Sequence, residues 1–400
     1  MKGIDMHQPG MGSLCAAVAL FALSLHGCTD GTVDAGQSCV DGDEDACVSD
    51  PGACTNGAEN PPICDFFGWD PGPYPDPTYD AIDGRGWPDQ TGGAHLCLWQ
   101  DDALAAISFT VDDNCAPDHN WWVTQAEAYG FKVTWFVITG NIGTGAYWGA
   151  WADFAALAAR GHEIQSHTVT HSDNQSEADW EYRQSQTDIE TNIPGSRCRT
   201  LAYPNGTAYP TIASPYFIGA RGVTGALNHG HDIDFMNTRS LSSFYYATTH
   251  WASITNMFTF DAGQASSYRA WQAMHFHDLS DVAKADLITG FELIRAQGRD
   301  AWVGLFREVI QYARERNDAT VEVQGIAASR IQLNVTDTLD DDLYDYPLTI
   351  KVRLDGSWTG ATASQGGTPA PVELIAHEGE TYALVNVIPD RGPVTLSRVP

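Results

Sequence analysis

The sequence predicts an α/β domain with a largely parallel sheet or barrel, followed by a small β-sandwich. Between residues 105 and 165, short apolar runs alternate with segments that carry apolar residues at helical spacing. This alternation is typical of parallel strands joined by crossover helices. From about residue 320 the pattern changes to period-two alternation between turn-rich loops, which favours a sandwich. The chain has 400 residues, 43% of them hydrophobic, so it can bury large cores.

The elements of the α/β domain are expected in a regular order. Strands are predicted at 105–111, 132–138 and 162–165. Helices are predicted at 121–129, 151–160, 281–297 and 300–316. Six short strands predict the sandwich, at 320–324, 330–335, 348–354, 372–375, 381–385 and 394–397. The domain boundaries that follow are 85–318 for the α/β domain and 319–400 for the sandwich.

The first 27 residues are expected to form a lipoprotein-type signal peptide. The apolar run at 14–25 is too short for a membrane span of about 20 residues and has the length of a signal-peptide core. The following Leu25-His26-Gly27-Cys28 resembles the bacterial lipobox, which predicts lipidation of Cys28. The alternative is plain cleavage with an ordinary thiol at that position. Either way the protein is expected to be exported, to the bacterial cell envelope if it is lipidated and otherwise as a secreted protein.

Residues 28–84 are expected to form an acidic, Cys-rich tether. From Cys28 to Asp80 there are twelve Asp or Glu and no Lys or Arg. Charge repulsion and few apolar residues predict an extended segment. Its four cysteines indicate two disulfides formed in an oxidising compartment, between Cys39, Cys47, Cys54 and Cys64. The pairing of Cys97, Cys115 and Cys198 does not follow from the sequence.

The net charge of the chain excludes some classes of partner. Asp and Glu number 51 against 21 Lys and Arg, which leaves a formal charge of −30. Such a surface repels nucleic acid and anionic lipid headgroups, so the only membrane contact expected is the lipid anchor at Cys28. Uncharged or amine-bearing glycans and divalent metals stay open as partners.

Two pairs of residues in the α/β domain suggest metal chemistry. Asp112 and Asp113 stand where a strand runs into a loop, so one carboxylate can bind a metal while the other accepts a proton. His167 and His171 are four residues apart, and on a helical turn they would share one face and one metal. Each pair alone is more often structural than functional.

Two further segments suggest groups that act on a substrate. Tyr203, Asn205 and Gly206 belong to a tight loop after a strand, whose backbone N–H groups could face an oxyanion, so they are candidate oxyanion or substrate residues. His277 has an acidic neighbour at the end of another strand, which suits a general acid or base. His275 lies two residues before it and is the competing candidate.

Taken together and in this order, the segments resemble the polysaccharide deacetylase family, the NodB-homology domain of carbohydrate esterase family 4. Thr110-Val-Asp-Asp113 resembles its T-F-D-D motif, and His167-Thr-Val-Thr-His171 its H-[ST]-x-x-H motif. Arg160-Gly-His-Glu-Ile-Gln-Ser-His167 is similar to R-G-H-E-I-[GA]-[NS]-H, the most specific match, and Thr134-Trp-Phe-Val137 to the T-F-F strand. The similarity covers roughly residues 100–315.

The resemblance implies a deformed (β/α) barrel that holds one divalent metal. That metal is most often Zn²⁺, with Co²⁺ or Ni²⁺ as substitutes, and the reaction removes acetyl groups from an N-acetylated chitin-, peptidoglycan- or exopolysaccharide-type glycan. Carried over, Asp113, His167 and His171 are the expected metal ligands. Asp112 is the expected base, and His277 the acid that protonates the leaving amine.

The sequence departs from the family pattern at three places. The third motif, R-x-P-[YF], has Ala202 in place of the arginine that pairs with the base, so the partner of Asp112 is unassigned. The stretch from Ala202 to Gly206 resembles the A-Y-P-x-G form of some relatives. The fourth motif, which orients the acid, has no clear copy, and Asp232 and Asp234 are the candidates. His275 stands where the fifth motif usually has Leu.

Other functions compete with N-deacetylation. An acetylxylan esterase of the same fold would use the same residues on an ester. A catalytically silent surface protein that binds glycan through the sandwich is a second rival, although the intact carboxylate and histidine pairs argue against it. Serine esterase chemistry would need a G-x-S-x-G nucleophile elbow, which the sequence lacks.

Overall fold

The structure is a computed structural model that describes residues 85–242, 251–260 and 267–399. The predicted signal peptide, the lipobox at Cys28 and the acidic tether with its disulfides therefore lie outside the described residues. Within the described residues, no helix has both the length and the apolar character needed to cross a membrane.

The α/β domain is built on one curled, wholly parallel sheet. Its strand order is β6-β5-β4-β3-β2-β8-β7, and β9 pairs with β2 as an additional strand. The first three strands along the chain that enter this sheet are buried throughout, as expected of a sheet covered on both faces. The strands are β2 (Ala105–Val111), β3 (Val133–Val137), β4 (Glu163–Ser166), β5 (Thr200–Ala202), β6 (Gly219–Arg221), β7 (Leu241–Ser242), β8 (Trp271–Phe276) and β9 (Ala301–Val303).

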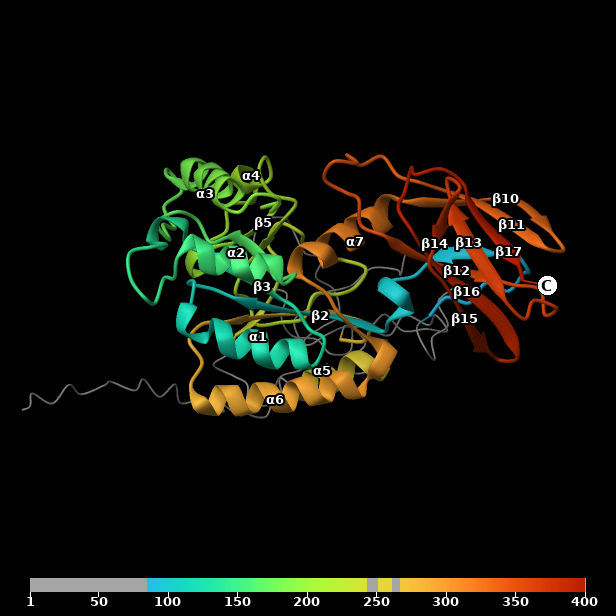
Figure 1. Cartoon of the computed structure of the whole chain (residues 1–400), viewed down its shortest axis with the longest axis horizontal. Coiled ribbons are helices and arrows are strands. Elements are labelled where there is room, and N and C mark those ends of the chain that lie inside the picture. The colour runs from blue at the N-terminus through green and yellow to red at the C-terminus, as the bar shows by residue number, and fades with distance from the viewer. Residues whose placement is uncertain (1–84, 243–250, 261–266, 400) are drawn as a thin grey trace, which may run out of the picture. The chain divides into compact units, whose positions relative to one another are not determined.

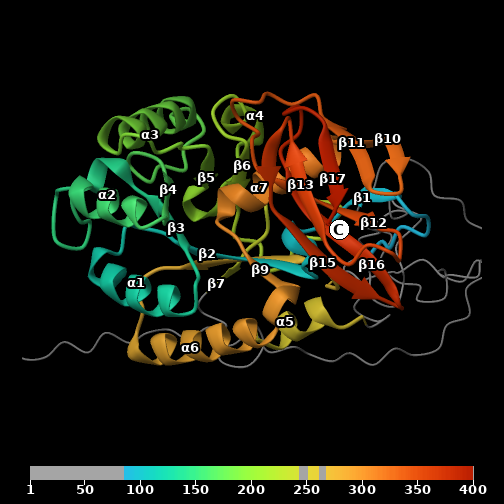
Figure 2. The same cartoon turned by 45° about the vertical axis from the view of Figure 1, so that its right-hand side comes forward.

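Helices lie around this sheet, as the views in Figures 1 and 2 show, and all but α7 connect two of its strands. They are α1 (His119–Ala128), α2 (Trp151–Ala159), α3 (Ala178–Asn192), α4 (Pro210–Ala213), α5 (Trp251–Phe258), α6 (Asp281–Ala296) and α7 (Phe306–Asp318). The predicted deformed barrel is confirmed as a curled sheet whose strand path is open rather than a closed ring. The helix predicted at 300–316 begins too early, because 301–303 forms β9 and joins the parallel sheet.

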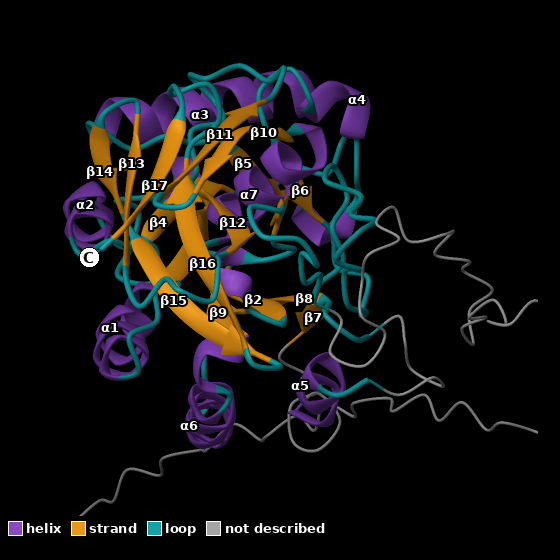
Figure 3. Ribbon diagram, turned by 90° about the vertical axis from the view of Figure 1, so that its right-hand side faces the viewer, coloured by secondary structure: helices purple, strands orange, loops and turns teal. Residues whose placement is uncertain are grey.

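The C-terminal region consists of two antiparallel sheets. One has the order β1-β12-β16-β15 and the other β10-β11-β17-β13-β14 (Figure 3). Their apolar side chains form a separate core. The strands are β1 (Ala94–Leu96), β10 (Thr320–Ala327), β11 (Arg330–Thr336), β12 (Leu348–Arg353), β13 (Ala361–Gln365), β14 (Thr368–Ala370), β15 (Val372–His377), β16 (Glu380–Val387) and β17 (Val394–Arg398).

The N-terminal part of the described chain joins the two regions. Strand β1 precedes the barrel in sequence, yet it pairs antiparallel with β12 of the C-terminal sheet. Next to it, the buried Lys351 Nζ lies 2.7 Å from Asp102 Oδ2 and 3.6 Å from the centre of the Trp87 ring. Because a buried charge must be paired, this contact ties the sandwich to the segment that leads into β2.

Three cysteines fall within the described residues. Cys97, Cys115 and Cys198 are all buried and all carry free thiols. Burial raises the pKa of each thiol above its ordinary value, so these groups stay uncharged at neutral pH.

Candidate metal and catalytic site

The predicted site residues follow strands of the parallel sheet. Asp112 and Asp113 come directly after β2, His167 after β4, and His277 after β8. Because carboxyl ends of parallel strands meet at one edge of a sheet, the topology gathers these residues from distant parts of the sequence.

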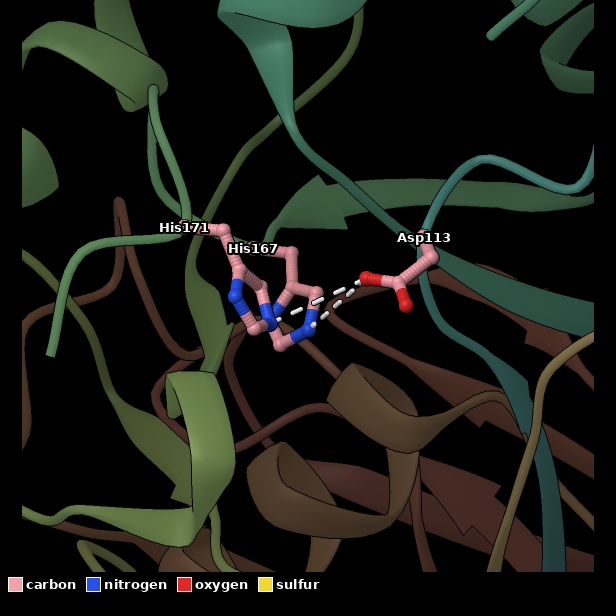
Figure 4. A group of neighbouring side chains, drawn as sticks. All are labelled: Asp113, His167 and His171. Carbon is pink, nitrogen blue, oxygen red and sulfur yellow. Dashed lines mark ion pairs between the residues drawn. The ribbon is translucent and has the colours of Figure 1, made fainter. Parts of the chain in front are cut away.

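The structure brings three potential metal ligands together. Asp113 Oδ1 lies 3.6 Å from His167 Nε2 and 3.8 Å from His171 Nε2, as Figure 4 shows. The three ligand atoms lie within 4.8 Å of one another. Ligand atoms about 2.0–2.1 Å from a tetrahedral metal are roughly 3.3 Å apart, so a small inward shift would suffice. Asp113 Oδ1 is buried without a hydrogen-bond partner among the described residues. Because buried polar atoms ordinarily have a partner, this oxygen fits the role of a cation ligand.

The hydrogen bonding of His167 prepares it for metal binding. Its Nδ1 lies 2.8 Å from the carbonyl oxygen of Ala202, which can only accept, so Nδ1 carries the proton. The lone pair of Nε2 then points toward Asp113, the tautomer that a metal requires. Burial also lowers the pKa of His167 and keeps the imidazole neutral.

The histidine pair is not on a helical turn, so that expectation was wrong. Residues 167–171 form a loop with left-handed backbone at Thr168 (φ 69°) and His171 (φ 61°). The bend is held by the buried Glu181 of α3, whose Oε2 accepts the N–H of Val169 at 2.6 Å and of Thr170 at 2.9 Å. A buried carboxylate therefore fixes the loop that turns His171 back toward Asp113.

The partner of Asp112 is Arg221, at the end of β6. The Arg221 Nη2 donates to Asp112 Oδ2, and both side chains are almost wholly buried. Burial by itself would raise the pKa of Asp112, but the charge of Arg221 outweighs it and holds that pKa well below the ordinary range. The other oxygen, Oδ1, is buried and has no partner among the described residues. Asp112 is therefore ionised and is oriented through Oδ2, while Oδ1 is not engaged in a hydrogen bond with the described residues.

Arg221 was not identified from the sequence, although a signal for it exists. It is the only charged residue in the stretch Ile218-Gly-Ala-Arg221-Gly, which otherwise suits a buried strand. A charge on a buried strand must have a partner, and Asp112 was the site carboxylate whose cationic partner was still unassigned. The arginine missing from the third motif is thus replaced from the neighbouring strand, since Ala202 pairs with Arg221.

The two candidate acids lie in different surroundings. His277 Nε2 is 3.7 Å from Asp113 Oδ2, and its side chain is 38% exposed, so it can meet both the ligand group and a substrate. His275 is buried, and its Nδ1 lies 2.7 Å from Ser240 Oγ. Burial, reinforced by the charge of Arg221, lowers the pKa of His275 to about 3. The accessible His277 therefore suits a proton donor better.

The loop predicted to face an oxyanion uses most of its polar groups internally. The Tyr203 hydroxyl donates to the Met236 carbonyl at 2.9 Å, and the Gly206 N–H donates to the Tyr203 carbonyl at 3.0 Å. The Asn205 amide lies at the surface, 3.1 Å from Asp173 Oδ2. Neither Tyr203 nor Gly206 thus offers a free donor through these groups, which leaves Asn205 as the accessible member of the three.

The hydrogen bonds of Asp232 and Asp234 are made with near neighbours in the chain. Both are exposed; the Asp232 N–H donates to the His229 carbonyl, and Asp234 Oδ1 accepts the N–H of Met236. Within the described residues, neither carboxylate forms a hydrogen bond or an ion pair with His277, whose ion-pair partner is Asp113. The expectation that one of them orients the acid therefore lacks support from this geometry.

Comparison with known proteins finds one matching family model and one curated relative. Residues 102–215 match the family model described as polysaccharide deacetylase. The match to a polysaccharide deacetylase domain is thus shown for residues 102–215. A protein from a Bacillus species named gellan lyase is 37% identical over 341 residues, which cover 78% of this chain and 13% of that protein. The chain thus spans only a small part of the length of that relative.

Solved structures with some similarity carry related names. A polysaccharide deacetylase from Bacillus cereus is 18% identical, with a TM-score of 0.31, over 34% of this chain and 46% of that one. A family 4 carbohydrate esterase from Streptomyces lividans, in complex with acetate, is 14% identical, with a TM-score of 0.35. That match covers 50% of this chain and 92% of the esterase.

Proposed function

We propose that the chain is a metal-dependent hydrolase that removes acetyl groups from an N-acetylated glycan. The observation that carries the proposal is the meeting of Asp113, His167 and His171 beside a buried carboxylate held by Arg221. Two neutral imidazoles and one carboxylate suit Zn²⁺ first, with Co²⁺ or Ni²⁺ as substitutes. The match to the polysaccharide deacetylase family supports the same reaction class.

In this proposal Asp113, His167 and His171 hold one divalent cation. Such a cation supplies Lewis acidity, which lowers the pKa of a nearby water molecule and polarises the acetyl carbonyl. His167 keeps its ring fixed through the Ala202 carbonyl, and Glu181 keeps the His171 loop in place. Positions fixed in this way reduce the reorganisation needed during the reaction.

Asp112 is the proposed general base. Its Oδ2 is held by Arg221, and its free Oδ1 can take the proton of the attacking water. Its low pKa keeps it ionised throughout the neutral range, so the base is always available, although a base of low pKa accepts protons less readily. Asp113 provides the carboxylate oxygen of the metal-ligand set, so Asp112 is not needed as a ligand and can act as the base.

His277 is the proposed general acid. It lies beside Asp113 and is partly exposed, so it can donate a proton to the leaving nitrogen as the acetyl C–N bond breaks. We expect His277→Ala to lower turnover on an N-acetyl substrate by about 10²–10⁴-fold. His275→Ala should cost less. Acetate esters should depend less on His277, because an alcohol leaves more readily than an amine.

The substrate proposal is an acetylated polysaccharide or oligosaccharide of the chitin, peptidoglycan or exopolysaccharide type. The strongly negative chain favours an uncharged or amine-bearing polymer over an anionic one. A second candidate is an acetyl ester, on xylan or on the polymer for which the Bacillus relative is named. The same residues would perform either hydrolysis.

The test is acetate release from a matched panel of substrates, with and without a chelator. The panel contains N-acetylated chitooligosaccharide, peptidoglycan, acetylated xylan and acetylated gellan. We expect release from an N-acetylated member, loss with chelator, and loss in Asp112→Asn but not in the exposed control Asp342→Asn. Binding of a glycan without any acetate release would favour a silent binding protein instead.

Export and anchoring form a separate proposal. We infer from the sequence alone that the chain is exported and lipidated at Cys28. Growth of bacterial cells that express the protein with a labelled fatty acid should label the wild type and not Cys28→Ser. Equal labelling of the two proteins would contradict lipidation at this residue.

A further inference from the structure

The structure contains a hydrogen-bonded cluster next to the catalytic groups that none of the roles above uses. It consists of Cys115, Tyr147 and Asp278, which come from three separate segments of the chain. Cys115 follows the carboxylate pair after β2, Tyr147 lies between β3 and α2, and Asp278 follows His277 directly.

Backbone contacts first attach the Tyr147 segment to the turn after β2. The Tyr147 carbonyl accepts the N–H of Ala116 at 2.9 Å. The next carbonyl, of Trp148, accepts the side-chain amide of the buried Asn114 at 3.1 Å. The turn needs this support, because Asp113, Asn114 and Cys115 have φ of 57°, 66° and 39°. Such left-handed backbone is strained and persists only where its surroundings hold it.

Side chains then extend the connection to the loop after β8. The Tyr147 hydroxyl donates to Asp278 Oδ1, while Cys115 Sγ lies 3.3 Å from that hydroxyl and 3.1 Å from the Asp112 carbonyl. The bond from Tyr147 lowers the pKa of Asp278, as expected for a hydroxyl that donates to an ionised carboxylate.

The cluster thus spans the gap between the two loops that carry the proposed base and acid. Strands β2 and β8 are neighbours, with Val111 opposite Phe276, so the loops leave the sheet side by side. His277 stands between Phe276, fixed in the sheet, and Asp278, fixed by Tyr147. Its Nε2 is held 3.7 Å from Asp113 Oδ2, although its own buried Nδ1 has no partner among the described residues.

We propose that Tyr147 is a positioning residue, which holds the His277 loop against the Asp113 turn through Asp278. The proposal rests on the proposed function, because it assigns Tyr147 a part in the same reaction. A displacement of a reacting group by about 1 Å can cost about 10²-fold in rate. Loss of the Tyr147 hydroxyl should therefore slow the reaction without removing any group that takes part in it.

The experiment compares Tyr147→Phe with the matched control Tyr216→Phe. Tyr216 also donates to a carboxylate, Asp179 Oδ1 of α3 at 2.6 Å, and neither of these two residues has a part in the proposed reaction. With N-acetylated chitooligosaccharide as probe, we expect Tyr147→Phe to lower kcat about 10- to 100-fold, with KM, bound zinc and Tm as in the control. Asp278→Asn, which keeps an acceptor oxygen, should retain most of kcat, and Asp278→Ala should behave like Tyr147→Phe.

A second readout does not depend on turnover. Hydrogen exchange of the peptide that contains residues 277–280 should be faster in Tyr147→Phe than in Tyr216→Phe, measured on the full zinc-loaded chain. Unchanged exchange, unchanged kcat, or a loss of zinc or Tm that accounts for the lower kcat would each overturn the proposal. If the wild type releases no acetate from any glycan, the proposed function fails, and the exchange measurement alone decides whether Tyr147 holds the loop.

Discussion

Replacing Arg221 by methionine should expose how strongly the structure depends on the Asp112 ion pair. The guanidinium is fully buried, the Asp112 side chain is 4% exposed, and the two are in direct contact. Methionine keeps much of the volume of the side chain and removes its charge. The substitution therefore leaves a carboxylate buried without its partner, which is far more costly than the loss of a surface pair.

The expected loss of stability is about 3–5 kcal/mol at pH 7, the usual cost of breaking a buried ion pair from one side. The free energy of unfolding, from urea titration, measures it. A matched control is Arg197→Met, because the Arg197 and Asp345 side chains are 48% and 36% exposed. A surface pair of that kind contributes about 0–1 kcal/mol.

The pH dependence of the effect has a definite sign. In the wild type the pKa of Asp112 is lowered, so the pair stabilises the fold above the ordinary aspartate pKa of about 4 and this contribution falls as the pH drops below it. Without Arg221, burial raises the pKa of Asp112 instead, and the folded variant takes up a proton at higher pH. The stability difference between wild type and variant should therefore be largest near pH 7 and shrink toward pH 4.

The acid limb of acetate release by Arg221→Met should also move to higher pH, because the proposed base becomes protonated there. Arg221→Lys keeps a positive charge and should lie between the wild type and the methionine variant in both measurements. A methionine variant with wild-type stability at pH 7 and an unshifted acid limb would refute the role assigned to Arg221.

Three further predictions follow from the same geometry. Asp113→Asn should lose bound zinc, measured by elemental analysis, whereas Asp112→Asn should keep zinc and lose acetate release; equal zinc loss would show that the two roles are misassigned. Glu181→Gln should weaken zinc binding about 10- to 100-fold in a competition assay, because it disturbs the loop behind His171; unchanged affinity would contradict that support role. Deletion of 319–400 should give an aggregation-prone protein in light scattering, since Ala94–Leu96 would lose its strand partner; a soluble, cooperatively unfolding truncation would contradict this.

The sequence predicts the α/β region well because its strands are buried on both faces. Residues 105–111 were expected as a strand and form β2 with the same bounds. Helix starts were harder to predict where a short strand intervenes, as at 301–303 before α7. The membership of Ala94–Leu96 in the C-terminal sheet lay beyond prediction, because the pairing joins residues more than 250 positions apart and three residues carry no pattern of their own.

In the candidate site, too, the residues that belong to local sequence motifs could be predicted, and a residue paired with a distant part of the chain could not. Motif spacing brought Asp113, His167 and His171 together correctly, but the spacing alone suggested a helix where the chain forms a left-handed bend. Arg221 was missed because its partner is 109 residues away and follows a different strand. In a parallel sheet, residues at the carboxyl ends of different strands become neighbours only once the sheet has formed, as Asp112 and Arg221 do.

The most direct test of the account is acetate release from N-acetylated chitooligosaccharide by chelator-treated protein as zinc is added back. The account predicts no release at the start and a rise that reaches its plateau at about one equivalent of zinc per chain, because the chain offers one set of three ligands with a position left for water. His171→Ala should stay inactive over the same range. Full release before any zinc is added, or none from the glycans of the panel at saturating zinc, would contradict a metal-dependent deacetylase.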